Sequence, residues 1–125
     1  MKRQSPVERL RAICLALPGT SEKLSHGEPT FWAGARMFAT FANGDSHHGA
    51  GRDGVWCAAP EGAQRVLVDA DADRFFVPPY VGPRGWIGVW LDRSPDWNLV
   101  ASVIEDAYRT IAPKRALAAF EAKSR

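Results

Sequence analysis

One stretch of the chain alternates between two kinds of side chain: Gly85-Trp86-Ile87-Gly88-Val89-Trp90-Leu91-Asp92. A repeat of two is typical of a β-strand, because successive side chains of a strand point to opposite faces of the sheet. The three aliphatic side chains share one face, which suits a core beneath helices. The two tryptophans and Gly88 share the other face, and what that face does is the main functional question that the sequence raises.

Length and composition indicate a single globular domain. The chain has 125 residues, of which 46% are hydrophobic and 24% are charged, and these values are ordinary for a soluble protein. A domain of this size, residues 1–125, can bury a core without a disulfide or a metal. No run of about 18 apolar residues could span a membrane, and the N-terminus lacks the apolar segment of a signal peptide. We therefore expect a cytoplasmic protein with no membrane partner.

Capping residues, turn residues and hydrophobic periodicity predict the order of the elements. Helices are expected over about 6–17, 60–68 and from Ser94-Pro95 to Ile111, with a short terminal helix over 114–123. Strands are expected over 29–33, 36–42, 54–58 and 85–92, the first two joined by a tight turn at Gly34-Ala35. Residues 20–28 are predicted to form a polar connection, and residues 74–83 an irregular crossing. This order predicts an α+β fold, with helices packed on a small and mostly antiparallel sheet.

Several runs of the sequence resemble one known family. They are Leu17-Pro18-Gly19-Thr20-Ser21-Glu22, His26-Gly27-Glu28-Pro29-Thr30-Phe31, Arg36-Met37-Phe38-Ala39, Trp86-Ile87-Gly88-Val89-Trp90-Leu91-Asp92, Asp96-Trp97, Glu105-Asp106-Ala107-Tyr108-Arg109 and Ala112-Pro113-Lys114-Arg115. In this order they are similar to the MmcQ/YjbR family over nearly the whole chain. The resemblance implies a small α+β domain related in shape to the CyaY-like fold. It also implies DNA binding through a double-wing arrangement, a description common in this family, and it supplies no catalytic residues. The glycine- and histidine-rich loop from Asn43 to Gly54 departs from the family pattern where a wing would lie.

The tryptophans form the first candidate site. Trp86 and Trp90 share a face, Trp56 could join them from a neighbouring strand, and Gly88 would leave a shallow floor between the rings. Such rings can stack on nucleobases or line a small-molecule pocket, to which we add His26. The alternative is that the rings are covered by the first helix, by the Phe75-Phe76 crossing or by a second copy of the chain, because large aromatic side chains are mostly buried.

The basic residues form the second candidate site. Arg52, Arg84, Lys114 and Arg115 could contact the phosphates of DNA. Lys114 and Arg115 could equally interact with the negative C-terminal end of the third helix. Both ends of the chain are basic, and they could form one patch if they meet in space or could simply be a solvated surface. The residues in question are Lys2, Arg3, Arg9 and Arg11 near the start, and Arg109, Lys114, Arg115, Lys123 and Arg125 near the end.

The sequence gives little support for a metal site, a cofactor or catalysis. His47 and His48 are adjacent, so on an extended chain they would point in opposite directions, and no zinc-ligand spacing connects them to another donor. Cys14 and Cys57 are expected to be small, buried apolar side chains rather than a disulfide. Neither a nucleophile elbow nor a dinucleotide-binding glycine motif is present. We therefore predict no metal, no cofactor and no catalytic residue.

Three functions remain open at this point. The first is a non-enzymatic DNA-binding domain of the MmcQ/YjbR type. The second is a small-molecule pocket built on the tryptophan face. The third is a protein–protein module with the tryptophans at a homodimer seam, so that either a monomer or a homodimer is expected.

Overall fold

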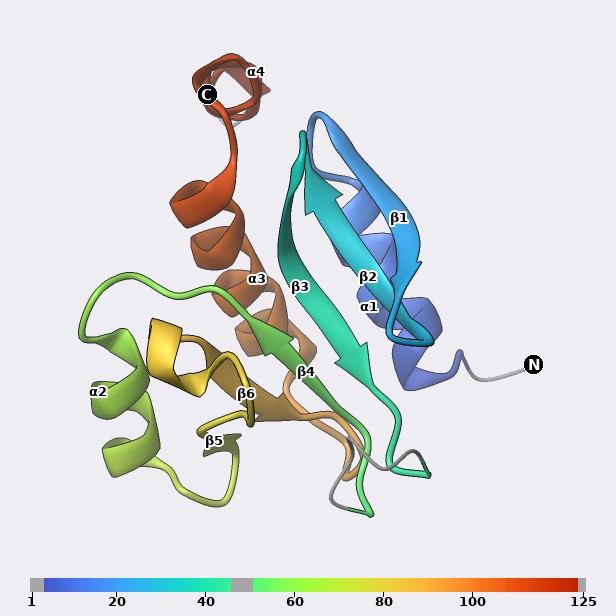
Figure 1. The fold of residues 1–125 in the computed structure, drawn as a ribbon, viewed down its shortest axis with the longest axis vertical. Coiled ribbons are helices and arrows are strands. Elements are labelled where there is room, and N and C mark those ends of the chain that lie inside the picture. Colours follow the sequence, from blue (N-terminus) through green and yellow to red (C-terminus); the bar gives the residue numbers. More distant parts are fainter. Residues whose placement is uncertain (1–3, 46–50, 124–125) are drawn as a thin grey trace.

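The computed structural model describes residues 4–45 and 51–123 and shows helices packed against one six-stranded sheet (Figure 1). The elements follow in the order α1 (Pro6–Leu15), β1 (Thr20–Ser25), β2 (Glu28–Ala33), β3 (Arg36–Ala42), β4 (Gly54–Cys57), α2 (Ala63–Ala70), β5 (Phe75–Phe76), a 3-10 turn η1 (Gly82–Arg84), β6 (Ile87–Trp90), α3 (Trp97–Ile111) and α4 (Lys114–Lys123). The α+β class predicted from the sequence is confirmed. No helix within the described ranges is both long enough and apolar enough to cross a membrane.

The sheet has the strand order β1-β2-β3-β4-β6-β5, and every neighbouring pair is antiparallel. Helices α1 and α3 lie behind the sheet in Figure 1, so they cover one of its two faces. We call this the helix-covered face, and we call the opposite side the open face. The two faces differ in what they contain, and that difference positions the candidate site.

The helix-covered face holds most of the core. Phe38 on β3 meets Tyr108 of α3 edge to face, with ring centroids 5.8 Å apart, and the Tyr108 hydroxyl donates a 2.5 Å hydrogen bond to the Pro18 carbonyl oxygen. Both Cys14 and Cys57 are free thiols and are buried, as predicted. Fully buried aliphatic side chains from α1, the sheet and α3 complete this layer: Leu10, Val55, Ile87, Val89, Leu91, Val100 and Ile104.

The helix boundaries differ in detail from the sequence predictions. Helix α1 begins as expected, because Ser5 and Glu8 form a reciprocal capping box, but it ends at Leu15 rather than at residue 17. Helix α3 is capped by Asp96, whose carboxylate accepts from the backbone N–H groups of Asn98 and Leu99. The predicted helix start at Ser94-Pro95 is therefore wrong, because Asp96 supplies a better acceptor for the first backbone N–H groups of the helix. Helix α2 spans Ala63–Ala70, later than the predicted 60–68.

The predicted polar connection over residues 20–28 was wrong. Residues 20–25 form the edge strand β1, which pairs with β2 along its whole length. An edge strand has little apolar surface to bury, and here Leu24 is 72% exposed. The alternation of polar and apolar side chains that marks a strand is therefore missing from its sequence. The predicted turn at Gly34-Ala35 is confirmed, since Ala33 pairs directly with Arg36.

The predicted strand over 85–92 is present but shorter, because only Ile87–Trp90 pairs regularly. It runs between β4 and the two-residue strand β5. The crossing over 74–83 therefore contributes a strand, Phe75–Phe76, at the edge of the sheet. Trp86 precedes the paired residues.

Candidate functional site

The three tryptophans of the predicted aromatic face do not form one surface. Trp86 is buried, with 3% of its surface exposed, and the Arg84 guanidinium lies over its ring at 5.3 Å from the centroid. Next to it, the Gln64 amide Nε2 donates to the backbone carbonyls of Trp86 and Gly82. Trp86 therefore belongs to the packing between α2 and β6.

Trp90 is also covered, in this case by Phe76 and Arg52. The rings of Phe76 and Trp90 stack with centroids 3.9 Å apart, and the Arg52 guanidinium lies 4.3 Å from the Trp90 centroid. The expected shallow floor at Gly88 is absent, because the Phe76 ring occupies the space that a side chain at position 88 would need. The sequence left open which part of the chain, or a second copy of it, would cover the tryptophans. For Trp90 the cover is the Phe75-Phe76 crossing.

Arg52 is held in this stack by Asp92. Its Nε and Nη2 atoms donate to the two carboxylate oxygens at 2.8 and 2.9 Å. These hydrogen bonds lower the pKa of Asp92 below its ordinary value and raise that of Arg52. Both bonds hold the guanidinium on the Trp90 ring and tie residue 52 to the end of β6.

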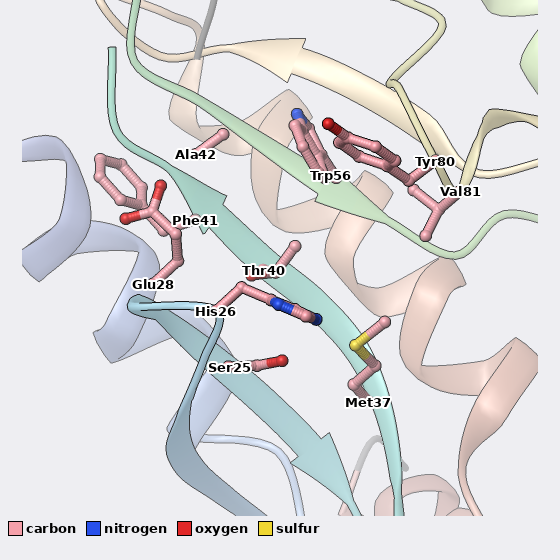
Figure 2. A pocket seen from close by; sticks show the side chains of 10 residues that line it. All are labelled: Ser25, His26, Glu28, Met37, Thr40, Phe41, Ala42, Trp56, Tyr80 and Val81. Carbon is pink, nitrogen blue, oxygen red and sulfur yellow. The ribbon is translucent and has the colours of Figure 1, made fainter. Parts of the chain in front are cut away.

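Trp56 is buried, with 8% of its surface exposed, and it lines a mainly apolar pocket on the open face (Figure 2). The pocket has a volume of about 330 Å³, which is at the small end of the range for ligand sites. Its walls come from β1, β2, β3, β4, the turn between β1 and β2, and the segment before η1. We call it the open-face pocket, and its lining residues are Ser25, His26, Glu28, Met37, Thr40, Phe41, Ala42, Trp56, Tyr80 and Val81.

Two of these residues are held by unusual backbone conformations. His26 and Gly27 have φ angles of +53° and +80°, as a two-residue turn of type I′ requires, and this turn directs the imidazole over the sheet. Tyr80 has φ +64°, and its ring lies against Trp56 with centroids 6.4 Å apart and planes inclined at 44°. A positive φ is uncommon outside glycine and costs of order 1 kcal/mol or more, and such residues often cluster at functional sites.

Polar groups converge on the same pocket. The Thr30 and Thr40 hydroxyls are 2.7 Å apart, and Thr30 also donates to the Glu28 carbonyl oxygen at 3.0 Å. The Glu28 carboxylate accepts from the backbone N–H of Asn43 at 2.6 Å. Figure 2 places this carboxylate at the end of the pocket that lies away from Trp56 and Tyr80. The pocket therefore combines an aromatic wall with hydroxyl, imidazole and carboxylate groups.

Sequence reasoning found His26 and Trp56 for this pocket and missed the other members. The signal for the turn was available, since a His-Gly pair between two polar strand-like runs favours positive φ angles. Ser25 and Glu28 flank that turn and would have followed from it. Nothing local in the sequence marks Tyr80, which reaches the pocket through the chain path between β5 and η1.

The four cations proposed for DNA contact do not lie together. Arg52 is engaged with Asp92, and Arg84 lies over Trp86. Lys114 and Arg115 are exposed at the start of α4, which lies at the top of Figure 1, whereas the loop that carries Arg52 lies at the bottom.

The basic chain ends do not merge either, as far as the described residues show. Helix α4 lies far from the first turn of α1 in Figure 1. Arg11 pairs with Glu22 at 2.7 Å, and the Arg9 guanidinium lies over the Trp97 ring. Lys2, Arg3, His47, His48 and Arg125 lie outside the described residues, as does the tip of the proposed wing loop.

Comparisons with known proteins identify relatives of this chain. The family model described as YjbR matches residues 15–110. The crystal structure of Deinococcus radiodurans protein DR2400, a DUF419 domain, is similar to the chain with a TM-score of 0.71 and 18% sequence identity. The match covers 90% of this chain and 84% of that one, and at this identity it shows a shared fold. No curated protein matches the sequence.

Proposed function

The chain belongs to the YjbR family, and we propose that it binds a small molecule in the open-face pocket. The observation that carries this proposal is the pocket itself, about 330 Å³ in volume on the open face of the sheet, opposite helices α1 and α3. A protein of this size buries its apolar surface where it can. Here Met37, Trp56 and Tyr80 surround a hollow in place of a packed core, and two backbone conformations of positive φ hold its rim.

The chemistry of the walls suits a compact molecule with an apolar body and a polar end. Trp56, Tyr80, Val81 and Met37 offer apolar contact. The Ser25 hydroxyl can donate or accept a hydrogen bond, and the Thr40 hydroxyl, whose proton goes to Thr30, can accept one. Such a mixture of apolar walls and a few polar groups is typical of small-molecule sites. No catalytic role follows from it, and binding is the function proposed.

A ligand screen tests this function. Thermal unfolding of the full chain is measured against a panel of small metabolites, because a ligand that binds only the folded state raises its melting temperature. A saturable rise should be lost in Met37→Ala, which removes one wall of the pocket. The matched control is Leu24→Ala, which removes an exposed apolar side chain from β1 outside the pocket and should leave the rise intact. Equal effects of the two variants, or no saturable ligand in the panel, would overturn the proposal.

DNA binding is the second candidate, and the observation that favours it is the exposed pair Lys114 and Arg115 at the start of α4. Fluorescence anisotropy with duplex DNA distinguishes the two functions. Contacts to phosphates release counterions, so affinity should fall steeply as salt rises and should weaken in the double variant Lys114→Ala, Arg115→Ala. Salt-independent binding, or binding unaffected by this variant, would remove DNA as the partner of this surface.

A further inference from the structure

We infer that the ligand of the open-face pocket is an organic ammonium cation, an inference that rests on the function proposed above. The first observation is the arrangement of the two rings that form its aromatic wall. Trp56 and Tyr80 have centroids 6.4 Å apart and planes inclined at 44°. Rings that touch at this angle form two adjoining walls and leave no parallel slot between them for a flat ring.

Adjoining aromatic walls suit a rounded, positively charged group. The face of an aromatic ring carries partial negative charge, and tryptophan and tyrosine bind quaternary ammonium groups through it. Met37 adds a polarisable thioether from β3 to the same pocket. Together these three side chains can surround a trimethylammonium group, whose methyl groups need apolar contact and whose charge needs the ring faces.

The charge of the lining residues also favours a cationic ligand. Of the ten described residues that line the pocket, Glu28 carries the acidic group and none is a lysine or an arginine, although the chain as a whole has a net charge of +2. An anionic ligand would face the Glu28 carboxylate, and repulsion between like charges is unfavourable at low dielectric. The hydrogen bond from the Asn43 N–H orients this carboxylate.

The position of Glu28 assigns it a secondary role. Figure 2 shows its carboxylate across the pocket from the aromatic wall, so it attracts a cation through space and does not contact it at the rings. The Ser25 and Thr40 hydroxyls lie between these ends and can meet a polar tail of the ligand. Choline has this combination of a trimethylammonium head and a hydroxyl tail, and it is the probe that we choose.

The test compares choline with 3,3-dimethyl-1-butanol, which has the same shape with carbon in place of the charged nitrogen. Both are titrated by calorimetry into the full chain. Choline should bind about tenfold more tightly or better, as expected for a partly desolvated cation–π site. If the neutral molecule binds equally well or better, the ammonium inference is overturned while the proposed pocket stands. If neither binds, the inference is likewise overturned, and the metabolite screen alone decides whether the pocket binds anything.

Variants at Tyr80 and Glu28 separate the cation–π contact from simple packing. Tyr80 is 71% exposed, so changing it does not threaten the fold. Tyr80→Leu should weaken choline about tenfold, whereas Tyr80→Phe, which keeps the ring, should stay within about twofold. Glu28→Gln keeps an acceptor for the Asn43 N–H and should weaken choline severalfold without changing the neutral molecule. Choline binding that Tyr80→Leu leaves unchanged would contradict the assignment.

Discussion

The two faces of the sheet differ in how they are covered. On the helix-covered face, Phe38 and its neighbours are fully buried against α3. On the open face, the cover over Trp90 comes from a short strand and one arginine, and beside it a pocket remains. The comparison teaches that one face supplies the stability of the fold, which leaves the other able to carry a site.

Adjacent residues on β3 give the sharpest test of this division. Successive side chains of a strand point to opposite faces, so Phe38 points to Tyr108 of α3 while Met37 lines the open-face pocket. Phe38→Ala should lower the free energy of unfolding by about 3–5 kcal/mol, because it opens a cavity in a packed core. Met37→Ala should cost about 1 kcal/mol, because Met37 is half-buried. Urea denaturation measures both, and equal costs would remove the distinction between the faces.

Two buried thiols on the helix-covered face, Cys14 and Cys57, predict that the free energy of unfolding falls at alkaline pH. Burial raises the pKa of Cys57 to about 12 from an ordinary value of 9.0, and burial, with the nearby Cys57, raises that of Cys14. The unfolded chain loses these protons first, so the stabilising effect is complete below pH 9.0 and is lost as pH rises toward the folded pKa. The slope is up to about 1.4 kcal/mol per pH unit for each thiol.

The same denaturation curves recorded between pH 8 and 11 should fall less steeply for Cys57→Ala than for the parent chain. The comparison of slopes removes the contributions of lysine and tyrosine, which both proteins share. Identical slopes would mean that Cys57 is accessible to ionisation in the folded state.

A substitution at Gly88 tests whether the Phe76 ring fills the space above this residue on the open face. A methyl group at position 88 would overlap the Phe76 ring, and that ring is stacked on Trp90 and cannot simply swing away. Gly88→Ala should therefore cost about 1–3 kcal/mol, as overpacking usually does. Adding Phe76→Ala should abolish that extra cost in a double-mutant cycle. A neutral Gly88→Ala would show that Phe76 does not fill this space in solution.

The smallest effect is expected at the Arg52–Asp92 pair, which is about a quarter exposed on each side. Arg52→Gln should lower stability by no more than about 1 kcal/mol, and less at high salt. Because the pair lowers the pKa of Asp92 from its ordinary 3.8, its contribution is complete above that pH and is lost as pH falls through the lower pKa of the folded state. A large effect at neutral pH would mean that the pair is essential to the open face.

The sequence was sufficient for the fold class and for the helix-covered face, because both rest on local patterns. The alternation of Ile87, Val89 and Leu91 and the apolar stripe of α3 each mark a buried surface. It failed at β1, whose exposed residues carry no apolar alternation. It left open whether Trp90 is covered, because the cover comes from Phe76 on another strand. A short window of residues does not show which distant segment a strand pairs with.

The candidate site was predictable only in part, for the same reason. His26 and Trp56 were named from residue type, but Tyr80, Met37 and Thr40 reach the pocket through strand order and chain path. Trp86 and Trp90 were grouped with Trp56 by parity along the strands, and parity cannot show that Phe76 and α2 lie over them. The basic residues were grouped by charge alone, and the fold separates them.

The methyl group of Met37 offers the most direct test of the claim that the open face carries a binding site. The chain has two methionines, Met1 and Met37, so protein labelled with ¹³C at the methionine methyl groups gives one reporter inside the pocket. On titration with choline, or with any ligand that the thermal screen supplies, we predict a saturable shift of the Met37 methyl resonance. The shift should follow the same binding curve as calorimetry. A ligand that binds by calorimetry but leaves the Met37 resonance unmoved would contradict the account.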